Sequence, residues 1–302
     1  MALRLSLHAY KKLESLDLRM LQIIEKNMAF YEYVPMEVIC RRLRRDEKFV
    51  SRRLKFLNEL GVVERLKGAY IGYILTSRGY DCLALNVLVK KRIVSNINLA
   101  PLGLGKESDV HLAISTSGDK IILKFHRLGR ISFRQTRRFR DYVGERRHIS
   151  WLYQSRLAAQ KEYEALKILH SVKVSVPRPI FQNRHVVVMS YFSGIPLYKV
   201  PPLSDPLETL RTIIQNVRIA HLEAGVIHGD LSEYNVLVDV RNGSITIIDW
   251  PQWISSTHPL AYFYIKRDIE NIIKFFRRKY KITMNLDEVL KDIVERGEGT
   301  AE

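Results

Sequence analysis

The segment 228–235 and the aspartate that follows it at position 249 constrain this chain more than any other feature. Two runs rich in β-branched residues, 236–240 and 244–248, are joined through Asn242-Gly243. Such runs around an Asn-Gly pair predict a β-hairpin with a two-residue primed turn. The hairpin brings the polar segment before its first strand close to the polar residue after its second.

In that register Asn235 lies opposite Trp250 and one step from Asp249, while the preceding loop carries Asp230. Two carboxylates and an amide oxygen are therefore expected at one rim of a small sheet. The spacing D-x-x-x-x-N followed by a later Asp matches the phosphoryl-transfer pattern, with Asp230 as catalytic base and Asn235 and Asp249 as Mg²⁺ ligands. The alternative is a plain hairpin whose polar ends face solvent.

The charge of the chain predicts an anionic partner. Its 302 residues include 49 Lys and Arg against 32 Asp and Glu, a formal net charge of +17, which favours nucleic acid or a ribonucleoprotein surface. No apolar run is long enough to span a bilayer and no signal peptide is recognisable, so we expect a cytoplasmic protein. Cys40 and Cys82 have no metal-ligand spacing and are expected to be free thiols.

The first ninety residues predict a winged helix-turn-helix domain. Apolar residues recur at helical spacing, Pro35 opens the second helix and Gly61 ends the third. The expected order is three helices, two strands and a helix, with these approximate bounds: 16–24, 35–43, 46–60, 62–65, 70–75 and 77–91.

The third of these helices is the expected recognition helix. Clustered cations on one surface are what phosphate binding requires, so we expect backbone and shape contacts with nucleic acid rather than base readout. The alternative is a protein-docking domain whose charged face is solvated. The expected nucleic-acid-binding residues are Arg41, Arg42, Arg44, Arg45, Lys48, Arg52, Arg53 and Lys55, with Arg65 and Lys67 on the wing.

The next segment carries the pattern of a nucleotide-binding lobe. Residues 90–101 are the expected join between domains, and GLGKESDV follows at 103–110. Its glycines permit close approach to phosphate, although the third glycine usual in a kinase loop is absent. Two strands, 110–115 and 120–125, are predicted next, and the second carries Lys124 at the spacing of a phosphate-pairing lysine. The expected phosphate-binding residues of the turn are Gly103, Gly105, Lys106 and Ser108.

A helix over 155–170 is expected to supply a carboxylate partner for that lysine, from Glu162 or Glu164. The strand 186–189 then leads into an interlobe hinge at 190–194. Met189 would line the back of an adenine pocket, and Ser190 and Phe192 would offer backbone groups to the base.

Residues 127–150 carry eight arginines and only two acidic residues. A segment this polar predicts a loop that orders on an anionic partner. Ser132 and Thr136 within it are possible autophosphorylation sites.

The remaining chain predicts a helix ending at Gly225, a long amphipathic helix through residues 265–276 and a shorter one after Asn285. In combination, GLGKESDV, LKFHRLGR, SFRQTRRFRDY, SWLYQSRLAAQKEYEAL, HGDLSEYN and IDWPQ resemble the RIO family of atypical protein kinases, and the winged helix resembles its second branch. The likeness covers essentially the whole chain. Trp250 and Ser190 depart from the usual Phe and Glu, and the short tail resembles archaeal members.

The resemblance implies an α+β fold with a winged-helix domain over 1–92 and a reduced two-lobed kinase domain over 93–302, divided into an N-lobe to about 189, a hinge and a C-lobe from 195. It also implies ATP with Mg²⁺ or Mn²⁺, autophosphorylation or ATP hydrolysis, and a monomer acting on the pre-ribosomal small subunit and its rRNA. By this likeness Glu162 pairs with Lys124, Ser108 contacts phosphate, and Asp249 is a metal ligand or itself accepts phosphate. An assembly scaffold that uses ATP as a conformational ligand and an aminoglycoside-type phosphotransferase are the alternatives.

Overall fold

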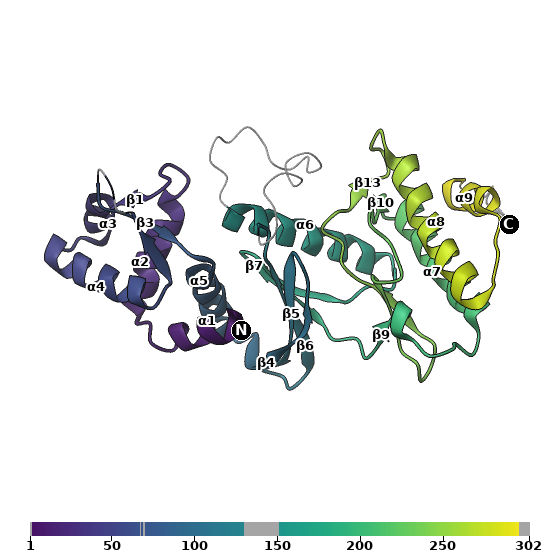
Figure 1. The fold of residues 1–302 in the computed structure, drawn as a ribbon, viewed down its shortest axis with the longest axis horizontal. Coiled ribbons are helices and arrows are strands. Elements are labelled where there is room, and N and C mark those ends of the chain that lie inside the picture. Colours follow the sequence, from purple (N-terminus) through teal and green to yellow (C-terminus); the bar gives the residue numbers. More distant parts are fainter. Residues whose placement is uncertain (1, 67, 69, 130–150, 296–302) are drawn as a thin grey trace. The chain divides into compact units, whose positions relative to one another are not determined.

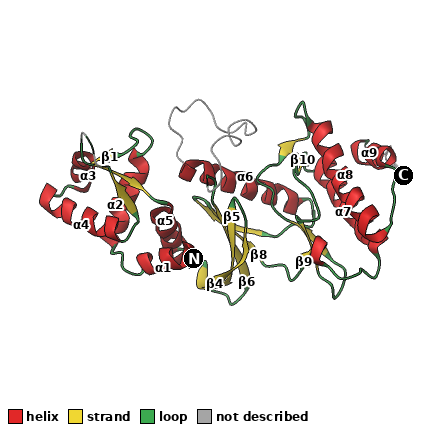
Figure 2. Ribbon diagram, in the orientation of Figure 1, coloured by secondary structure: helices red, strands yellow, loops and turns green. Residues whose placement is uncertain are grey.

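The computed structural model describes residues 2–66, 68, 70–129 and 151–295, with helices and strands arranged as in Figures 1 and 2. The chain forms two compact units. Unit 1 comprises residues 1–157 with 183–186, and unit 2 comprises 158–182 with 187–302. Both mix helices and strands, as predicted for an α+β fold. The predicted boundary between residues 92 and 93 does not coincide with this division and stays a prediction.

Unit 1 begins with the predicted winged-helix order (Figure 1). The helices and strands are α1 (Ala2–Tyr10), α2 (Ser15–Asn27), β1 (Val34–Pro35), α3 (Met36–Leu43), α4 (Glu47–Glu59), β2 (Val63–Arg65), β3 (Gly72–Leu75) and α5 (Ser77–Lys90). The strands form one sheet in the order β1-β3-β2. The predicted helices and wing are confirmed, whereas α1 and β1 were not predicted.

The apolar positions of these helices form one core because their spacing places them on the inward faces. Ile24 of α2, Ile39 of α3, Leu54 of α4 and Leu83 of α5 are fully buried in it. Helix α4 begins where the Asp46 side chain accepts a hydrogen bond from the Phe49 N–H at 2.9 Å. This cap satisfies one of the donors that a helix start leaves unpaired.

Three antiparallel strands follow: β4 (Val94–Leu104), β5 (Ser108–Ser115) and β6 (Lys120–His126). Strands β5 and β6 confirm the prediction. Residues 96–101, predicted as a join between domains, instead lie within β4. Asn96, Ile97 and Pro101 pair with β5, and the register shifts between Ile97 and Pro101. The connection from α5 shortens to residues 91–93.

Helix α6 (Trp151–Ser171) begins in unit 1 and continues through unit 2. It confirms the helix predicted over 155–170. The strands β7 (Pro179–Asn183) and β8 (Val186–Ser190) are neighbours in one sheet. The predicted strand over 186–189 is thereby confirmed.

In the part of unit 2 that the structure describes, three further helices and two small sheets follow. Its helices are α7 (Pro206–Leu222), α8 (Ala261–Tyr280) and α9 (Leu286–Val294), as predicted, and a 3₁₀ turn, η1, spans Leu197–Lys199. One sheet pairs β10 (Val226–Ile227) with β13 (Ile254–Ser255); the other has the order β12 (Ile245–Ile247), β11 (Val236–Val238) and β9 (Ile195–Pro196).

The β11–β12 hairpin exists, but its predicted register was wrong. Val236 pairs with Ile247, not with Asp249. The turn is longer than two residues because the Asp239 N–H donates to Ser244 O at 2.8 Å, and Asp239 O accepts from the Gly243 N–H at 2.8 Å. A shift of two residues keeps every side chain on its predicted face. Asn235 consequently pairs with Ile248, whose N–H donates to Asn235 O at 2.9 Å, and remains next to Asp249.

Two further expectations concern the whole chain. Among the residues that the structure describes, no helix combines the length and apolarity needed to cross a bilayer. Cys40 is partly buried and Cys82 is buried, and both are free thiols, as predicted.

Candidate active site

The predicted phosphate-binding turn lies at the tip of the β4–β5 hairpin in unit 1. Gly105 N–H donates to Ser108 O at 2.8 Å, which closes a tight turn around Lys106. Gly103 pairs with Val110, and a Cβ built on Gly103 would meet no atom of the described part of the chain within 4 Å. The backbone at this position is therefore open to a ligand.

Lys124 lies in the same cross-strand row as Gly103. Val110 of β5 pairs with Gly103 on one side and with Lys124 on the other. Paired and alternate residues of an antiparallel sheet point to one face, so Ser108, which pairs with His126, shares that face with Lys124. Lys124 is only 6% exposed. An ammonium and a hydroxyl beside an open glycine turn are suited to binding phosphate.

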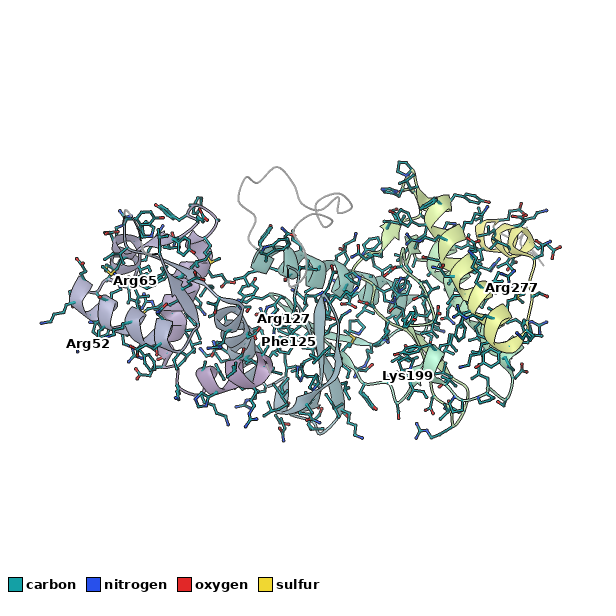
Figure 3. All side chains as sticks on the ribbon, viewed as in Figure 1. Arg52, Arg65, Phe125, Arg127, Lys199 and Arg277 are labelled. Carbon is teal, nitrogen blue, oxygen red and sulfur yellow. The ribbon has the colours of Figure 1, made fainter. Side chains whose placement is uncertain are left out.

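A buried ionic network lies directly behind this sheet. Arg127, the residue after β6, binds both carboxylate oxygens of Asp81 on α5, at 2.5 and 2.9 Å, and reaches Asp109 Oδ2 at 3.2 Å. The backbone N–H of Arg127 donates to Glu107 O, in the predicted phosphate-binding turn, at 2.6 Å. Figure 3 labels Arg127 beside Phe125, and its guanidinium lies 5.2 Å from the Phe125 ring centroid.

Arg127 was predicted to belong to a basic loop that orders on an anionic partner, and for this residue the prediction was wrong. The guanidinium is 6% exposed because two carboxylates replace its hydration. Residues 130–150 of the predicted loop, with Ser132 and Thr136, lie outside the described residues.

His185 completes the network. Its Nε2 lies 2.8 Å from Asp81 Oδ1. Burial lowers the pKa of His185 to about 4, and among the described residues its buried Nδ1 has no hydrogen-bond partner. The imidazole is therefore neutral at pH 7 and donates Nε2–H to the carboxylate. Burial alone would raise the pKa of Asp81, but Arg127 and His185 hold it well below its usual range.

In unit 2, the loop carrying Asp230 is fixed by hydrogen bonds to its backbone. His228 Nε2 lies 3.0 Å from Ile248 O, and the Asp230 N–H donates to His228 Nδ1 at 3.2 Å. The ring therefore carries its proton on Nε2. It lies against the Trp250 ring, with centroids 4.4 Å apart. The Asp230 residue itself is exposed.

Asp268 of α8 holds the other side of the loop, and sequence reasoning did not identify it. Its carboxylate accepts from the Gly229 N–H at 2.7 Å and the Leu231 N–H at 3.1 Å. The neighbouring Arg267 donates to Gly229 O, and Asn271 donates to Leu231 O at 3.2 Å. Burial raises the pKa of Asp268 to about 7, against the opposing effect of the two N–H donors. The available signal was an acidic residue within the apolar stripe of α8.

Asn235 and Asp249 come together as predicted, at the ends of β11 and β12. Asn235 Nδ2 donates to Asp230 O at 2.9 Å, which directs the amide oxygen away from that carbonyl. Asp249 has φ of 71°, a left-handed conformation uncommon for residues other than glycine and often found at functional sites.

The donor set fits Mg²⁺. Among the described residues, no group of three His, Cys, Asp or Glu side chains gathers into a metal site. Asn235 and Asp249 would supply one amide and one carboxylate oxygen. Mg²⁺ commonly takes few protein ligands and completes its octahedron with water and substrate phosphate.

The structure favours Glu162 over Glu164 as the internal carboxylate of α6. Glu162 is 1% exposed, and its Oε1 accepts from the Trp250 N–H at 3.3 Å, whereas Glu164 is exposed. Glu162 thus contacts the segment immediately after Asp249. Lys124 and Glu162 lie in different units, and their pairing stays a prediction.

The hinge residues lie at the end of β8. Met189 is 6% exposed. The Ser190 N–H donates to Arg178 O at 2.9 Å, so the group that Ser190 offers to adenine would be its carbonyl. The Phe192 ring packs so closely over Gly194 that a Cβ there would lie 2.4 Å from it. The adenine contacts of Met189, Ser190 and Phe192 stay predictions.

Known proteins share both parts of this architecture. Residues 109–289 match the RIO domain family, and residues 10–91 match the Rio2 N-terminal family. The chain belongs to the RIO kinase family, in its Rio2 branch. It is 44% identical over 261 residues to the RIO-type serine/threonine-protein kinase Rio2 of Methanocaldococcus jannaschii, covering 84% of this chain and 93% of that protein.

Other relatives agree. The serine/threonine-protein kinase rio2 of Schizosaccharomyces pombe is 37% identical, over 92% of this chain and 80% of its own length. The crystal structure of the Rio2 kinase-ADP/Mg²⁺-phosphoaspartate complex from Chaetomium thermophilum matches with a TM-score of 0.82 and 34% identity, covering 96% of this chain and 89% of that one. This member of the Rio2 branch is accordingly a serine/threonine-protein kinase that binds ATP.

The predicted nucleic-acid face of this RIO kinase is largely exposed. Figure 3 labels Arg52 on α4 and Arg65 on the wing. Lys67 lies outside the described residues. The exposed cations of α3, α4 and the turn between them are Arg41, Arg42, Arg44, Arg45, Lys48, Arg52 and Lys55, and we call them the α3–α4 basic face.

Arg53 was predicted on this outward face, and its placement was wrong. Its Nε donates to Asp17 Oδ1 at 2.9 Å, and a second guanidinium nitrogen binds Asp17 Oδ2. The Asp17 side chain is fully buried, so the bidentate pair fastens α4 to α2. Position 53 of α4 faces α2, and there the Asp17 carboxylate takes the place of water around the guanidinium.

Proposed function

We propose that this RIO kinase couples ATP-dependent phosphoryl transfer, with Mg²⁺ or Mn²⁺, to maturation of the small ribosomal subunit in the cytoplasm. The observation that carries the catalytic part is the support given to the Asp230 loop. Four side chains from two directions, His228, Arg267, Asp268 and Asn271, fix its backbone by hydrogen bonds. Positioning of this kind supplies much of the rate enhancement in phosphoryl transfer.

Each residue has a distinct role in this proposal. Lys124 and Ser108 bind phosphate oxygens, with Glu162 as the partner of Lys124. Asn235 and Asp249 hold the metal ion, which neutralises charge on the phosphates when bound. Asp230 accepts the proton of the attacking hydroxyl as its oxygen bonds to the γ-phosphorus and the bond to ADP breaks.

A second phosphoacceptor is Asp249 itself. One carboxylate oxygen would bond to the γ-phosphorus as ADP leaves, and water would then hydrolyse the acyl phosphate, releasing inorganic phosphate. The left-handed backbone of Asp249 sets this residue apart in the loop. The Chaetomium Rio2 kinase crystallised as a phosphoaspartate complex supports the same chemistry. In this case the protein works chiefly as an ATPase.

Two observations support the proposed ribosomal partner: the charge of the chain and the family to which it belongs. A net charge of +17 and the α3–α4 basic face favour a polyanion. Reversing the charge at position 52 by Arg52→Glu is expected to weaken rRNA binding and to reduce its salt dependence. Binding that stays constant across a salt series would remove the phosphate contact from this proposal.

Turnover of [γ-³²P]ATP with Mg²⁺ tests the catalytic part, with and without small-subunit particles. We expect wild-type turnover to be stimulated by particles and lost in Asp230→Ala and Asp249→Asn. Glu270→Gln, which changes a half-buried residue of α8 that pairs with Lys274, is the matched control and should leave turnover intact. Label stable to hydroxylamine identifies a hydroxyl acceptor, and labile label identifies an acyl phosphate, as expected for Asp249.

The alternatives predict different outcomes. A scaffold that uses ATP only as a conformational ligand would keep its cellular function in Asp230→Ala. An aminoglycoside-type phosphotransferase would label an aminoglycoside in the same assay.

A further inference from the structure

A groove of about 350 Å³ lies between α2 and α3, next to the α3–α4 basic face. Its charged lining is Arg19 and Lys26 of α2 and Arg42 of α3, and none of the described acidic residues lines it. Gln22 adds an amide, and Phe30 adds an aromatic ring at the end of α2. Arg42 belongs to both surfaces, so the groove continues the basic face.

The spacing of these residues shows how one helix builds most of the groove. Arg19, Gln22 and Lys26 recur at three- and four-residue intervals, which places them on one face of α2. All three cations are exposed, and within the described residues none of them forms an ion pair. The groove therefore presents a concentration of positive charge that a partner can neutralise.

Phe30 is the unusual member of this surface. Its side chain is 81% exposed, although burying a ring of this size is strongly favourable. The turn that presents it is fixed, because Asn27 O accepts from the Phe30 N–H at 2.9 Å and from the Tyr31 N–H at 3.1 Å. Single exposed apolar residues are ordinary, but this one borders a groove lined by cations.

We propose that this groove binds single-stranded nucleic acid, with one base stacked on Phe30 and the neighbouring phosphates on Arg19, Lys26 and Arg42. Cations along a groove together with an exposed aromatic ring are the combination that such sites use. A duplex would satisfy the cations but would keep its base faces stacked internally. The aromatic ring thus favours an unpaired strand.

The inference deepens the proposed rRNA partnership and rests on it only for the source of the strand. It assigns an unpaired segment of the strand to the α2–α3 groove. The α3–α4 basic face contacts the phosphates of single-stranded and duplex nucleic acid alike. The two surfaces are separable by mutation, since Phe30 belongs to the groove alone and Arg52 to the basic face alone.

The test uses the full-length protein and a labelled oligouridylate of about ten nucleotides, with an RNA duplex of equal length as the comparison. Anisotropy titrations across a salt series give the affinity and its salt slope. Phe30→Ala should weaken single-strand binding about tenfold, the scale of one lost stacking contact. It should leave duplex binding and the salt slope unchanged.

Two companion variants separate stacking from charge. Phe30→Trp should retain single-strand affinity, because it keeps an aromatic face. Lys26→Gln should lower the magnitude of the salt slope by about 0.7, the value for one phosphate contact to a single strand. Arg52→Glu is the control for the α3–α4 basic face and should weaken the binding of both the single strand and the duplex.

Unchanged single-strand affinity in Phe30→Ala would overturn the inference, as would an equal loss for single strand and duplex. Turnover of ATP without RNA should be the same in Phe30→Ala and wild type. If particles did not stimulate ATP turnover by the wild-type protein, and oligouridylate still bound, the result would count against the ribosomal role. The groove assignment would still stand.

Discussion

Unit 1 and unit 2 each bury an aspartate carboxylate completely, yet they stabilise it in opposite ways. Asp81 and Asp268 are both 1% exposed. Asp81 has an arginine in bidentate contact and a pKa held well below the usual range. Asp268 has two backbone N–H donors instead, and burial raises its pKa to about 7.

The difference lies in what replaces water around each charge. A guanidinium compensates for the lost hydration of a carboxylate with a full opposite charge, whereas two peptide dipoles compensate only in part. Arg267 lies 3.8 Å from Asp268 but donates to the Gly229 carbonyl. Asp81 is thus an ionised carboxylate that holds α5 to the end of β6 through Arg127, and Asp268 is a titratable support for the loop that carries Asp230.

The largest expected effect comes from breaking the ion pair. Asp81→Asn removes the charge that compensates buried Arg127, leaving Asp109 as its other carboxylate contact. We expect the free energy of unfolding to fall by about 3–5 kcal/mol, as for other broken buried pairs. Chemical denaturation measures this, with Glu270→Gln as a surface control. A loss no greater than that of the control would mean that Asp81 does not carry a compensating charge.

Asp268→Asn is expected to affect catalysis more than stability. The amide oxygen can accept from one of the two loop N–H groups, but the amide nitrogen is a donor and opposes the other. Displacement of Asp230 by about 1 Å would lower kcat roughly 100-fold. Nucleotide Kd should change little, because within the described residues the hydrogen bonds of Asp268 go to the backbone of the Asp230 loop. A fall in nucleotide affinity as large as the fall in kcat would indicate general unfolding instead.

Local sequence patterns predicted the parts of the site that are close together in the chain. Asp230, Asn235 and Asp249 belong to one loop and one hairpin, so their proximity survived a two-residue error in register. The spacing of apolar residues was likewise sufficient for α2 to α5 and for α7 to α9, because each buries a continuous stripe.

Contacts between distant segments could not be predicted in this way. Arg127 stands in a run of arginines, and only the fold reveals that Asp81, 46 residues away, meets it. Asp268 contacts Gly229 across 39 residues. Arg53 faces inward for the same reason, since its partner Asp17 belongs to another helix. A charged residue that interrupts a pattern is the available signal, but the sequence does not name its partner.

Ser6→Ala tests how far the network of Asp81 extends. The Ser6 hydroxyl of α1 donates to Asp81 Oδ2 at 2.6 Å and is 1% exposed. Loss of one hydrogen bond to a charged group should cost about 2 kcal/mol, less than loss of the charge itself. Denaturation of Ser6→Ala beside Ser171→Ala, an exposed serine on α6, measures it. Equal losses in the two variants would remove α1 from the network.

The pH dependence of stability should distinguish the two units, with a slope of up to about 1.4 kcal/mol per pH unit. Asp268 has a folded pKa of about 7 against an ordinary value of 3.8. Between those values the folded state keeps a proton that the unfolded state loses, so this group makes the free energy of unfolding fall as pH rises. The contribution is complete below pH 4 and lost above pH 7.

His185 acts with the opposite sign. Its folded pKa of about 4 lies below the ordinary 6.5, so the unfolded state binds the extra proton between those values and stability rises with pH. Denaturation at several pH values between 4 and 7 should therefore show a steeper rise in Asp268→Asn than in wild type, and a weaker rise or a fall in His185→Gln. Parallel curves in all three proteins would mean that neither Asp268 nor His185 changes its protonation on folding, and that the N–H donors alone keep Asp268 as firmly ionised as Arg127 keeps Asp81.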